Sequence, residues 1–198
     1  MIAHLIIFME TNFESDIKKC IEVLNKGGLI LYPTDTVWGI GCDATNGQAV
    51  EKIYQLKKRA DEKAMIVLVA DEKDILRYVA APDLAIFDYL QKTTKSTTVV
   101  YDDALGLADN LMGKDGSIAI RIIKEEFCKQ LIKRFRKPIV STSANISGTK
   151  PAQIFNEISE EIKKGVKYIV QYRQYDETVS EPSSVIKWEN GKITILRK

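Results

Sequence analysis

The sequence is short of the residues that most often bind metals or act as nucleophilic catalysts. It contains one histidine, His4, and three cysteines that form no CxxC pair, at positions 20, 42 and 128. A structural zinc site takes about four ligands, mostly cysteine and histidine, so no such site is expected. Ser-His-Asp and Cys-His catalysis would depend on His4 alone, and we expect His4 to be a terminal or packed residue. An odd, unpatterned cysteine count favours a reducing compartment, the cytoplasm.

Long apolar runs are also missing. No run reaches the roughly 18 residues that a membrane-spanning helix needs, and the opening MIAHLIIFME lacks the basic region and cleavage site of a signal peptide. The net charge of +2 does not by itself indicate a nucleic-acid partner. With 45% hydrophobic and 28% charged residues, the 198-residue chain has an ordinary globular composition. We expect a cytoplasmic protein with no membrane segment.

What the sequence does contain is a regular alternation of helix and strand patterns. Helices are expected over 14–26, 47–59, 71–79, 83–91, 124–136 and 151–165, the last with Pro151 at its start. Strands are expected over 29–32, 65–70, 97–101, 117–123, 138–141, 168–172, 183–188 and 193–197, with a tight Asn190-Gly191 turn before the last. The pattern predicts one α/β domain over residues 1–198, with a twisted mixed sheet flanked by helices.

Three polar clusters lie at the end of an expected strand or directly after one. They are Thr34-Asp35-Thr36 within YPTDTVWGIGCDA, the stretch STSANISG at 141–148, and Arg121. Ligands of open α/β sheets bind beyond the carboxyl ends of strands, so the three clusters are predicted to form one site. We expect Gly39, Gly41 and Gly148 to let the backbone come close to a ligand. For any single cluster, ordinary turn formation is an equally good explanation.

Two basic stretches have more than one interpretation. Lys57 and Arg59 could project together at a polyphosphate, or they could be a solvated helix end. If they bind a polyphosphate, we expect replacement of Lys57 or Arg59 to abolish activity and leave stability nearly unchanged, as for surface residues. The six basic residues of 124–137 indicate either RNA binding or the solvent-exposed face of an amphipathic helix. Neither a GxxxxGK[ST] loop nor a GxGxxG turn is present.

The ordered set YPTDTVWGIGCDA, KKRADEK, SIAIR, STSANISG and SSVIKW resembles the YrdC-like family of threonylcarbamoyl-AMP synthases, in their short single-domain form. The resemblance runs from about residue 14 to 197. It implies a concave basic cavity and a nucleotidyltransferase that makes threonylcarbamoyl-AMP and pyrophosphate from L-threonine, bicarbonate and ATP with Mg2+. It also implies a role in tRNA modification, binding of tRNA or double-stranded RNA, and downstream threonylcarbamoyl-transferase proteins as partners.

The resemblance also assigns residues. The catalytic set is Lys57, Arg59, Ser143 and Asn145. The L-threonine contacts are Thr34, Arg121, Ser141 and Ser183, and the ATP contacts are Arg59, Lys63, Ser117, Ser143 and Arg197, with no metal ligand from the protein. Leu68 stands where several members have a threonine-contacting histidine, and the family's P-G-P-L-T segment is replaced by TKSTTVV.

Such a reaction needs positioning and charge neutralisation rather than a protein nucleophile, which suits a site of hydroxyl, amide and basic side chains. Two alternatives stay open. One is a non-catalytic RNA-binding protein. The other is a related carbamoyl transfer, which occurs in proteins that carry additional acylphosphatase and zinc-finger segments.

Overall fold

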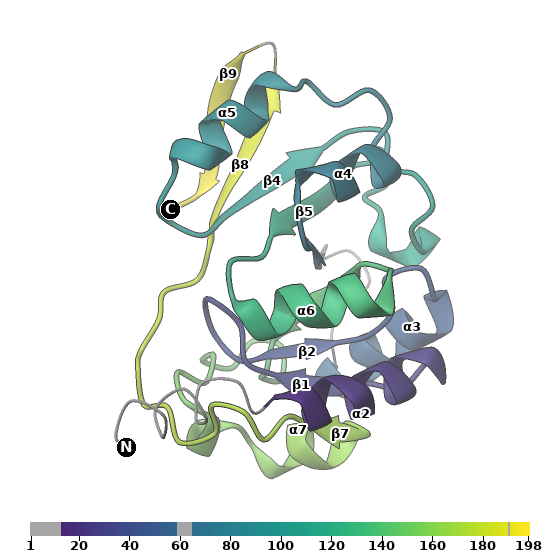
Figure 1. The fold of residues 1–198 in the computed structure, drawn as a ribbon, viewed down its shortest axis with the longest axis vertical. Helices are drawn as coiled ribbons and strands as arrows, with labels where there is room; N and C mark the ends of the chain where they lie inside the picture. The colour runs from purple at the N-terminus through teal and green to yellow at the C-terminus, as the bar shows by residue number, and fades with distance from the viewer. Residues whose placement is uncertain (1–12, 59–64, 190) are drawn as a thin grey trace, which may run out of the picture.

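The computed structural model describes residues 13–58, 65–189 and 191–198, and these form a mixed nine-stranded sheet (Figure 1). Its strands are β1 (Ile30–Tyr32), β2 (Gly39–Gly41), β3 (Ile66–Val69), β4 (Thr97–Tyr101), β5 (Ile118–Ile122), β6 (Ile139–Ser143), β7 (Tyr168–Ile169), β8 (Ser184–Glu189) and β9 (Lys192–Arg197). They lie in the order β7-β1-β2-β6-β3-β5-β4-β8-β9. The pairs β1–β7, β3–β5 and β4–β8 are parallel and the other pairs are antiparallel. The predicted α/β class and mixed sheet are confirmed.

Helices connect most of the strands. They are α2 (Glu14–Asn25), α3 (Gly47–Lys57), α4 (Glu72–Tyr78), α5 (Ala85–Lys92), α6 (Glu126–Phe135) and α7 (Glu160–Gly165), with short 3-10 helices η1 (Asp109–Leu111) and η2 (Phe155–Glu157). Several helix starts have a side-chain cap of the expected kind. Asn46 caps α3 by accepting from the Ala49 amide, and Asp71 caps α4 in a capping box. Lys58, in the left-handed region at φ 50°, ends α3.

The two faces of the sheet are covered unequally. Helices α2 and α6 lie side by side on one face, where Ile17 and Phe127 pack with Ile30 and Tyr32 of β1 (Figure 1). The other face is covered by α3, α4, α5, α7 and η1, which pack on a second core that includes Leu31. The alternation of Ile30, Leu31 and Tyr32 between the two cores is that of a strand buried on both faces. The cavity described below opens on the first face, beyond the part that α2 and α6 cover.

The prediction of one long helix over 151–165 is wrong. Helix α7 begins at Glu160, because the Ser159 hydroxyl accepts from the Ile162 amide and caps it there. Upstream, the chain forms η2, whose Phe155 ring packs against Trp38 with 4.9 Å between ring centroids. The aromatic contact holds this stretch against the sheet in place of a continuous helix.

Strand β2 was not expected, because it lies inside the stretch interpreted as a ligand-binding loop. It pairs with β1 on one side and β6 on the other. A Cβ atom on Gly41 would lie 2.7 Å from the Tyr32 ring and 2.7 Å from the Val140 carbonyl oxygen. Gly41 is therefore needed for the packing of Tyr32, and not for the approach of a ligand.

The remaining strands differ from prediction mainly at their ends. Strand β6 continues to Ser143, so that three polar residues belong to the strand itself, whereas the strand expected over 168–172 is reduced to β7. Of the expected turn before β9, Gly191 is at φ 74°, and Asn190 lies outside the described residues. No helix in the described part of the chain is long and apolar enough to cross a membrane.

Candidate active site

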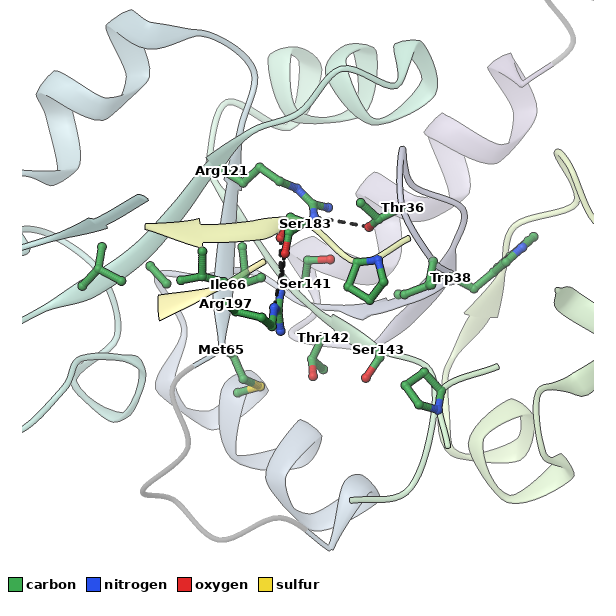
Figure 2. Close-up of a pocket in the computed structure, with 17 residues that line it drawn as sticks. Thr36, Trp38, Met65, Ile66, Arg121, Ser141, Thr142, Ser143, Ser183 and Arg197 are labelled. Atoms are coloured by element: carbon green, nitrogen blue, oxygen red, sulfur yellow. Dashed lines mark hydrogen bonds between the residues drawn. The ribbon is translucent and has the colours of Figure 1, made fainter. Parts of the chain in front are cut away.

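A cavity of about 340 Å3 opens on the sheet face beside α2 and α6 (Figure 2). Its polar lining comes from Thr36, Arg121, Ser141, Thr142, Ser143, Ser183 and Arg197, and its apolar lining includes Trp38, Met65, Ile66, Ala119, Val100 and Val185. Cross-strand register explains why distant residues meet here. Ser141 pairs with Ile66 and Ile66 pairs with Ala119, and paired residues point to the same face of a sheet.

Arg121 is the most buried charged side chain of the lining, at 3% relative exposure. Its Nη1 donates to Thr36 Oγ1 at 3.2 Å, and its Nη2 lies 3.3 Å from Asp35 Oδ1. Its Nε has no hydrogen-bond partner among the described residues. A buried guanidinium with an unused donor at the edge of a cavity is suited to bind an anionic ligand group.

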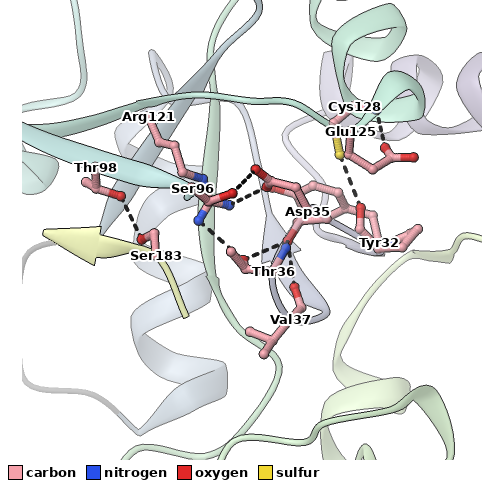
Figure 3. A network of polar contacts seen from close by, with 12 residues as sticks. Tyr32, Asp35, Thr36, Val37, Ser96, Thr98, Arg121, Glu125, Cys128 and Ser183 are labelled. Carbon is pink, nitrogen blue, oxygen red and sulfur yellow. Dashed lines mark hydrogen bonds and ion pairs between the residues drawn. The ribbon is translucent and has the colours of Figure 1, made fainter. Parts of the chain in front are cut away.

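Asp35 holds the loop between β1 and β2 against Arg121. Its Oδ2 accepts from Ser96 Oγ at 2.6 Å, so the carboxylate lies between a hydroxyl and the guanidinium (Figure 3). Its other oxygen, Oδ1, is within ion-pair distance of Arg121 but accepts no hydrogen bond from a described residue. The pair therefore stabilises Arg121 by charge more than by hydrogen-bond geometry, which leaves donor capacity for a ligand.

Arg197 brings a second guanidinium to the cavity from β9. Its Nε and Nη2 donate to the Ser183 carbonyl oxygen at 3.2 and 2.9 Å. Desolvation and the positive charge of Arg121 lower the pKa of Arg197. Two arginines close enough to affect one another favour a ligand with more than one negative charge. The hydroxyls of Ser183 and Thr98, 2.8 Å apart, fix the beginning of β8 beside them.

Lys57, Ser143 and Asn145 form a connected group below the cavity mouth. The Lys57 ammonium donates to the carbonyl oxygens of Ser143 and Asn145, the latter at 2.6 Å. Ser143 Oγ donates to Asn145 Oδ1 at 2.6 Å. Lys57 is 1% exposed, so the expectation that it is a surface residue is wrong. The Lys57 ammonium therefore mainly stabilises the chain that follows β6, through these two carbonyl oxygens.

The structure brings together some predicted residues and separates others. Arg121, Ser141, Ser143, Ser183 and Arg197 line the cavity, and Lys57 and Asn145 contact its wall. The other positions lie elsewhere or outside the described residues; they are Thr34, Ser117, Leu68, Arg59, Lys63 and His4.

Thr34 is buried within its own loop, where its hydroxyl donates to the Val37 carbonyl oxygen at 2.8 Å. Ser117 precedes β5 and donates to Asp115 at 2.6 Å. Leu68 packs in the core beneath α6. Arg59, Lys63 and His4 are not described. The assignments of Thr34 and Ser117 as ligand contacts thus remain predictions.

Thr36 belongs to a polar cluster that the sequence indicated, whereas two other polar residues of the site, Ser96 and Thr98, were not singled out. Thr36 lines the cavity and accepts from Arg121, whereas Ser96 and Thr98 support Asp35 and Ser183 from β4 and the chain before it. Thr36 lies in the stretch that was identified, two residues from Thr34. Ser96 and Thr98 carry no motif, since Ser96 meets Asp35 and Thr98 meets Ser183 only through contacts between distant parts of the chain.

Metal ligands are scarce in the described part of the chain. No three or more His, Cys, Asp or Glu side chains of the described residues are grouped so as to hold a metal ion. Among the described residues, the carboxylate beside the cavity is that of Asp35, which is engaged by Arg121 and Ser96. Because Mg2+ prefers carboxylate oxygens and water, these residues do not fit a Mg2+ ion held by the protein itself.

Comparison with known proteins identifies the family. Residues 22–198 match the Sua5/YciO/YrdC family model, described as "Telomere recombination". The chain belongs to the Sua5/YciO/YrdC family. It is 32% identical over 183 residues to threonylcarbamoyl-AMP synthase of Pseudoalteromonas translucida, covering 91% of this chain and 97% of that protein. It is also 32% identical over 161 residues to threonylcarbamoyl-AMP synthase of Photobacterium profundum, covering 79% and 86%.

The fold is that of a solved family structure. P. abyssi Sua5 complexed with L-threonine superposes with a TM-score of 0.80 at 22% identity, over 91% of this chain and 53% of the Sua5 chain. This chain therefore spans about half the length of P. abyssi Sua5.

Proposed function

We propose that this chain is an L-threonylcarbamoyl-adenylate synthase that uses L-threonine, bicarbonate and ATP. The observation that carries the proposal is Arg121, a buried guanidinium with an unpaired Nε at a hydroxyl-lined cavity, in a chain whose relatives are named threonylcarbamoyl-AMP synthases. The Sua5 structure of the same fold contains L-threonine. In our proposal Arg121 binds the threonine carboxylate, with Ser141, Ser183 and the Thr34 loop around the amino acid.

The proposed chemistry needs anions to be brought together. The threonine amine attacks the carbon of bicarbonate, and loss of water leaves a carbamate. A carbamate oxygen then forms a bond to the α-phosphorus of ATP, while the bond from that phosphorus to the pyrophosphate oxygen breaks. Neither step requires a protein nucleophile. Positioning and charge stabilisation are the effects that the lining residues can supply.

The nucleotide side of the site is assigned to the second arginine and the Lys57 group. In our proposal Arg197, Ser143 and Asn145 face the phosphates, Lys57 keeps Ser143 and Asn145 in place, and Arg59, Lys63 and Ser117 complete this side. Mg2+ is proposed to arrive bound to the ATP phosphates, since Asp35 is already engaged. The product would serve tRNA modification in the cytoplasm, with tRNA or double-stranded RNA and threonylcarbamoyl-transferase proteins as partners.

The test is pyrophosphate release from MgATP by the purified protein. We expect release only when L-threonine and bicarbonate are both present, and formation of labelled threonylcarbamoyl-AMP from labelled bicarbonate. The variant Ser143→Ala should be strongly impaired, while Lys58→Ala, next to the site but pointing to Glu161 at the surface, should keep full activity. Equal pyrophosphate release without threonine would reject the proposal, as would no release with all three substrates. The non-catalytic RNA-binding alternative predicts the latter result.

A further inference from the structure

A second cavity of about 330 Å3 lies where the two parallel central strands end. Strands β3 and β5 are neighbours and run in the same direction. The chain leaves β3 into α4, which packs on one core, and leaves β5 into α6, which packs on the opposite core. Neighbouring parallel strands whose connections leave to opposite faces form a crevice at their carboxyl ends, and open α/β sheets commonly bind ligands there.

The cavity walls combine an apolar floor with lysines. Ala70 follows β3 directly, Ile122 ends β5, and Phe87 and Leu90 of α5 provide half-buried apolar surface. Four lysines line the cavity, at 73, 95, 124 and 129, against two carboxylates, at 71 and 72. A pocket of this volume that offers both apolar surface and charged groups is within the size range of small-molecule sites.

The charged groups of the cavity are not equally available. Asp71 caps α4 and Glu72 accepts from Gln91, so both carboxylates are engaged. Lys124 donates to two backbone carbonyl oxygens, and Lys95 pairs with Glu181.

Lys73 and Lys129, from α4 and α6, are the remaining lysines. Neither ammonium has a hydrogen-bond or ion-pair partner among the described residues. Two available ammonium groups beside an apolar wall suit a ligand with an anionic end and an apolar body.

We propose that this switch-point cavity is a second binding site, for a small organic anion that carries an apolar group. The site is separate from the candidate active site, although the same strands serve both. In β5 the side chain of Arg121 lines the first cavity, and its neighbour Ile122 lines the second. The proposal does not depend on the reaction proposed above.

Calorimetric titration with three probes tests the chemistry of the site. The probes are 1-naphthyl phosphate, with both an anion and an apolar ring, 1-naphthol, with the ring alone, and inorganic phosphate, with the anion alone. We expect 1-naphthyl phosphate to bind at least about tenfold more tightly than either of the others. Equal binding of all three probes, or no binding of 1-naphthyl phosphate, would overturn the proposal.

Variants and amide NMR locate the binding. Lys73→Gln combined with Lys129→Gln should weaken 1-naphthyl phosphate by roughly tenfold and leave 1-naphthol unchanged. The matched control is Lys133→Gln, one turn further along α6 and outside this cavity. Amide shifts are expected at Ala70 and Ile123. Shifts confined to the lining of the first cavity, or unchanged affinity in the double variant, would show that the aryl phosphate binds elsewhere.

Discussion

The described basic side chains of the candidate active site are held by two kinds of partner, backbone carbonyl oxygens and side chains. Lys57 donates to backbone carbonyl oxygens, Arg121 is paired with a carboxylate and a hydroxyl, and Arg197 donates to the Ser183 carbonyl oxygen. Burying a charge is costly unless it is paired. At the residue scale the partners therefore determine which charge is left for a ligand, and Arg121, with its unpaired Nε, has the most unused capacity.

Arg121→Lys should weaken L-threonine binding at least roughly tenfold, because lysine cannot make a two-pronged contact with a carboxylate. Lysine keeps the charge beside Asp35, which makes it more informative than alanine. The measurement is calorimetric titration of threonine in the presence of a non-hydrolysable ATP analogue. The control is Arg136→Lys, an arginine at the end of α6 and away from the cavity. Unchanged threonine affinity in Arg121→Lys would mean that the carboxylate binds elsewhere.

Lys57→Met should lower the free energy of unfolding by about 3 kcal/mol, because it leaves two carbonyl oxygens without their charged donor. For a chain of this size we expect the melting temperature to fall by roughly 6–12 °C. The neighbouring Lys58→Met is the control, since its ammonium makes a surface ion pair with Glu161 and its side chain is 65% exposed. That change should cost less than about 0.5 kcal/mol. Equal melting temperatures for the two variants would contradict this role of Lys57.

Sequence reasoning identified many site residues by type and spacing, but it could not tell which atoms each would use. Lys57 was expected at an exposed helix end and is buried, because the chain after β6 folds back over it. Thr34 and Thr36 look alike in the sequence, yet only Thr36 lines the cavity. The difference comes from the turn that Thr34 makes with Val37. Which residue reaches the cavity depends on the direction of its side chain, and the amino-acid sequence does not give that direction.

At the scale of elements, the three polar clusters meet for a reason other than the expected one. They were predicted to converge at the carboxyl ends of parallel strands. Strand β6 is antiparallel to β3, and β3 is parallel to β5. The carboxyl ends of β6 and β5 therefore point in opposite directions. The clusters meet over the face of the sheet, where Ser141 and Arg121 project to the same side. Most strand positions were predictable from apolar runs, whereas strand order depends on pairings between distant residues, such as Gly39 with Ser143 and Ile30 with Tyr168.

The contact between α2 and β7 depends on one buried carboxylate. Asp16 accepts from the Tyr168 hydroxyl and from the amides of Gln171 and Tyr172. Asp16→Ala should therefore cost about 3 kcal/mol of unfolding free energy, since buried donors lose their acceptor. Urea unfolding measures the loss, and amide hydrogen exchange should accelerate first at Tyr172.

The control for Asp16 is Glu22→Ala on the exposed side of the same helix, which should cost under about 0.5 kcal/mol. If the two variants unfold at the same urea concentration, Asp16 does not anchor this edge.

At the scale of the whole molecule, one long connection joins the two ends of the sheet. Residues 170–183 run from β7, at one edge, to β8, next to the other edge (Figure 1). On the way Arg173 donates to the Thr34 carbonyl oxygen at 3.1 Å and pairs with Asp176. The connection thus supports the β1–β2 loop from outside.

The stability of this connection should depend on pH through Asp176. Hydrogen bonds from Thr178, and then Arg173, lower the pKa of Asp176 to about 2. A lowered folded-state pKa adds stability above the unfolded value, near 3.8, and that stability is lost as the pH falls through about 2.

Asp176→Asn should therefore be less stable than the parent at pH 6, and the difference should shrink as the pH falls toward 2, by thermal melting at a series of pH values. The adjacent, exposed Glu177→Gln should follow the parent throughout. A difference between Asp176→Asn and the parent that stays constant from pH 6 to pH 2 would contradict the assignment.

The lining of the first cavity runs from Thr36 to Arg197, almost the full span of the described chain. During synthesis, a nascent polypeptide that has emerged only as far as β6 already contains Arg121 and Ser141 but has no β8 or β9. Strand β4 would then present an open edge, and Ser183 and Arg197 would be absent from the anion site. Ribosome-bound intermediates should consequently be unable to retain an anionic ligand in this cavity, so that binding competence is acquired only once β9 has emerged.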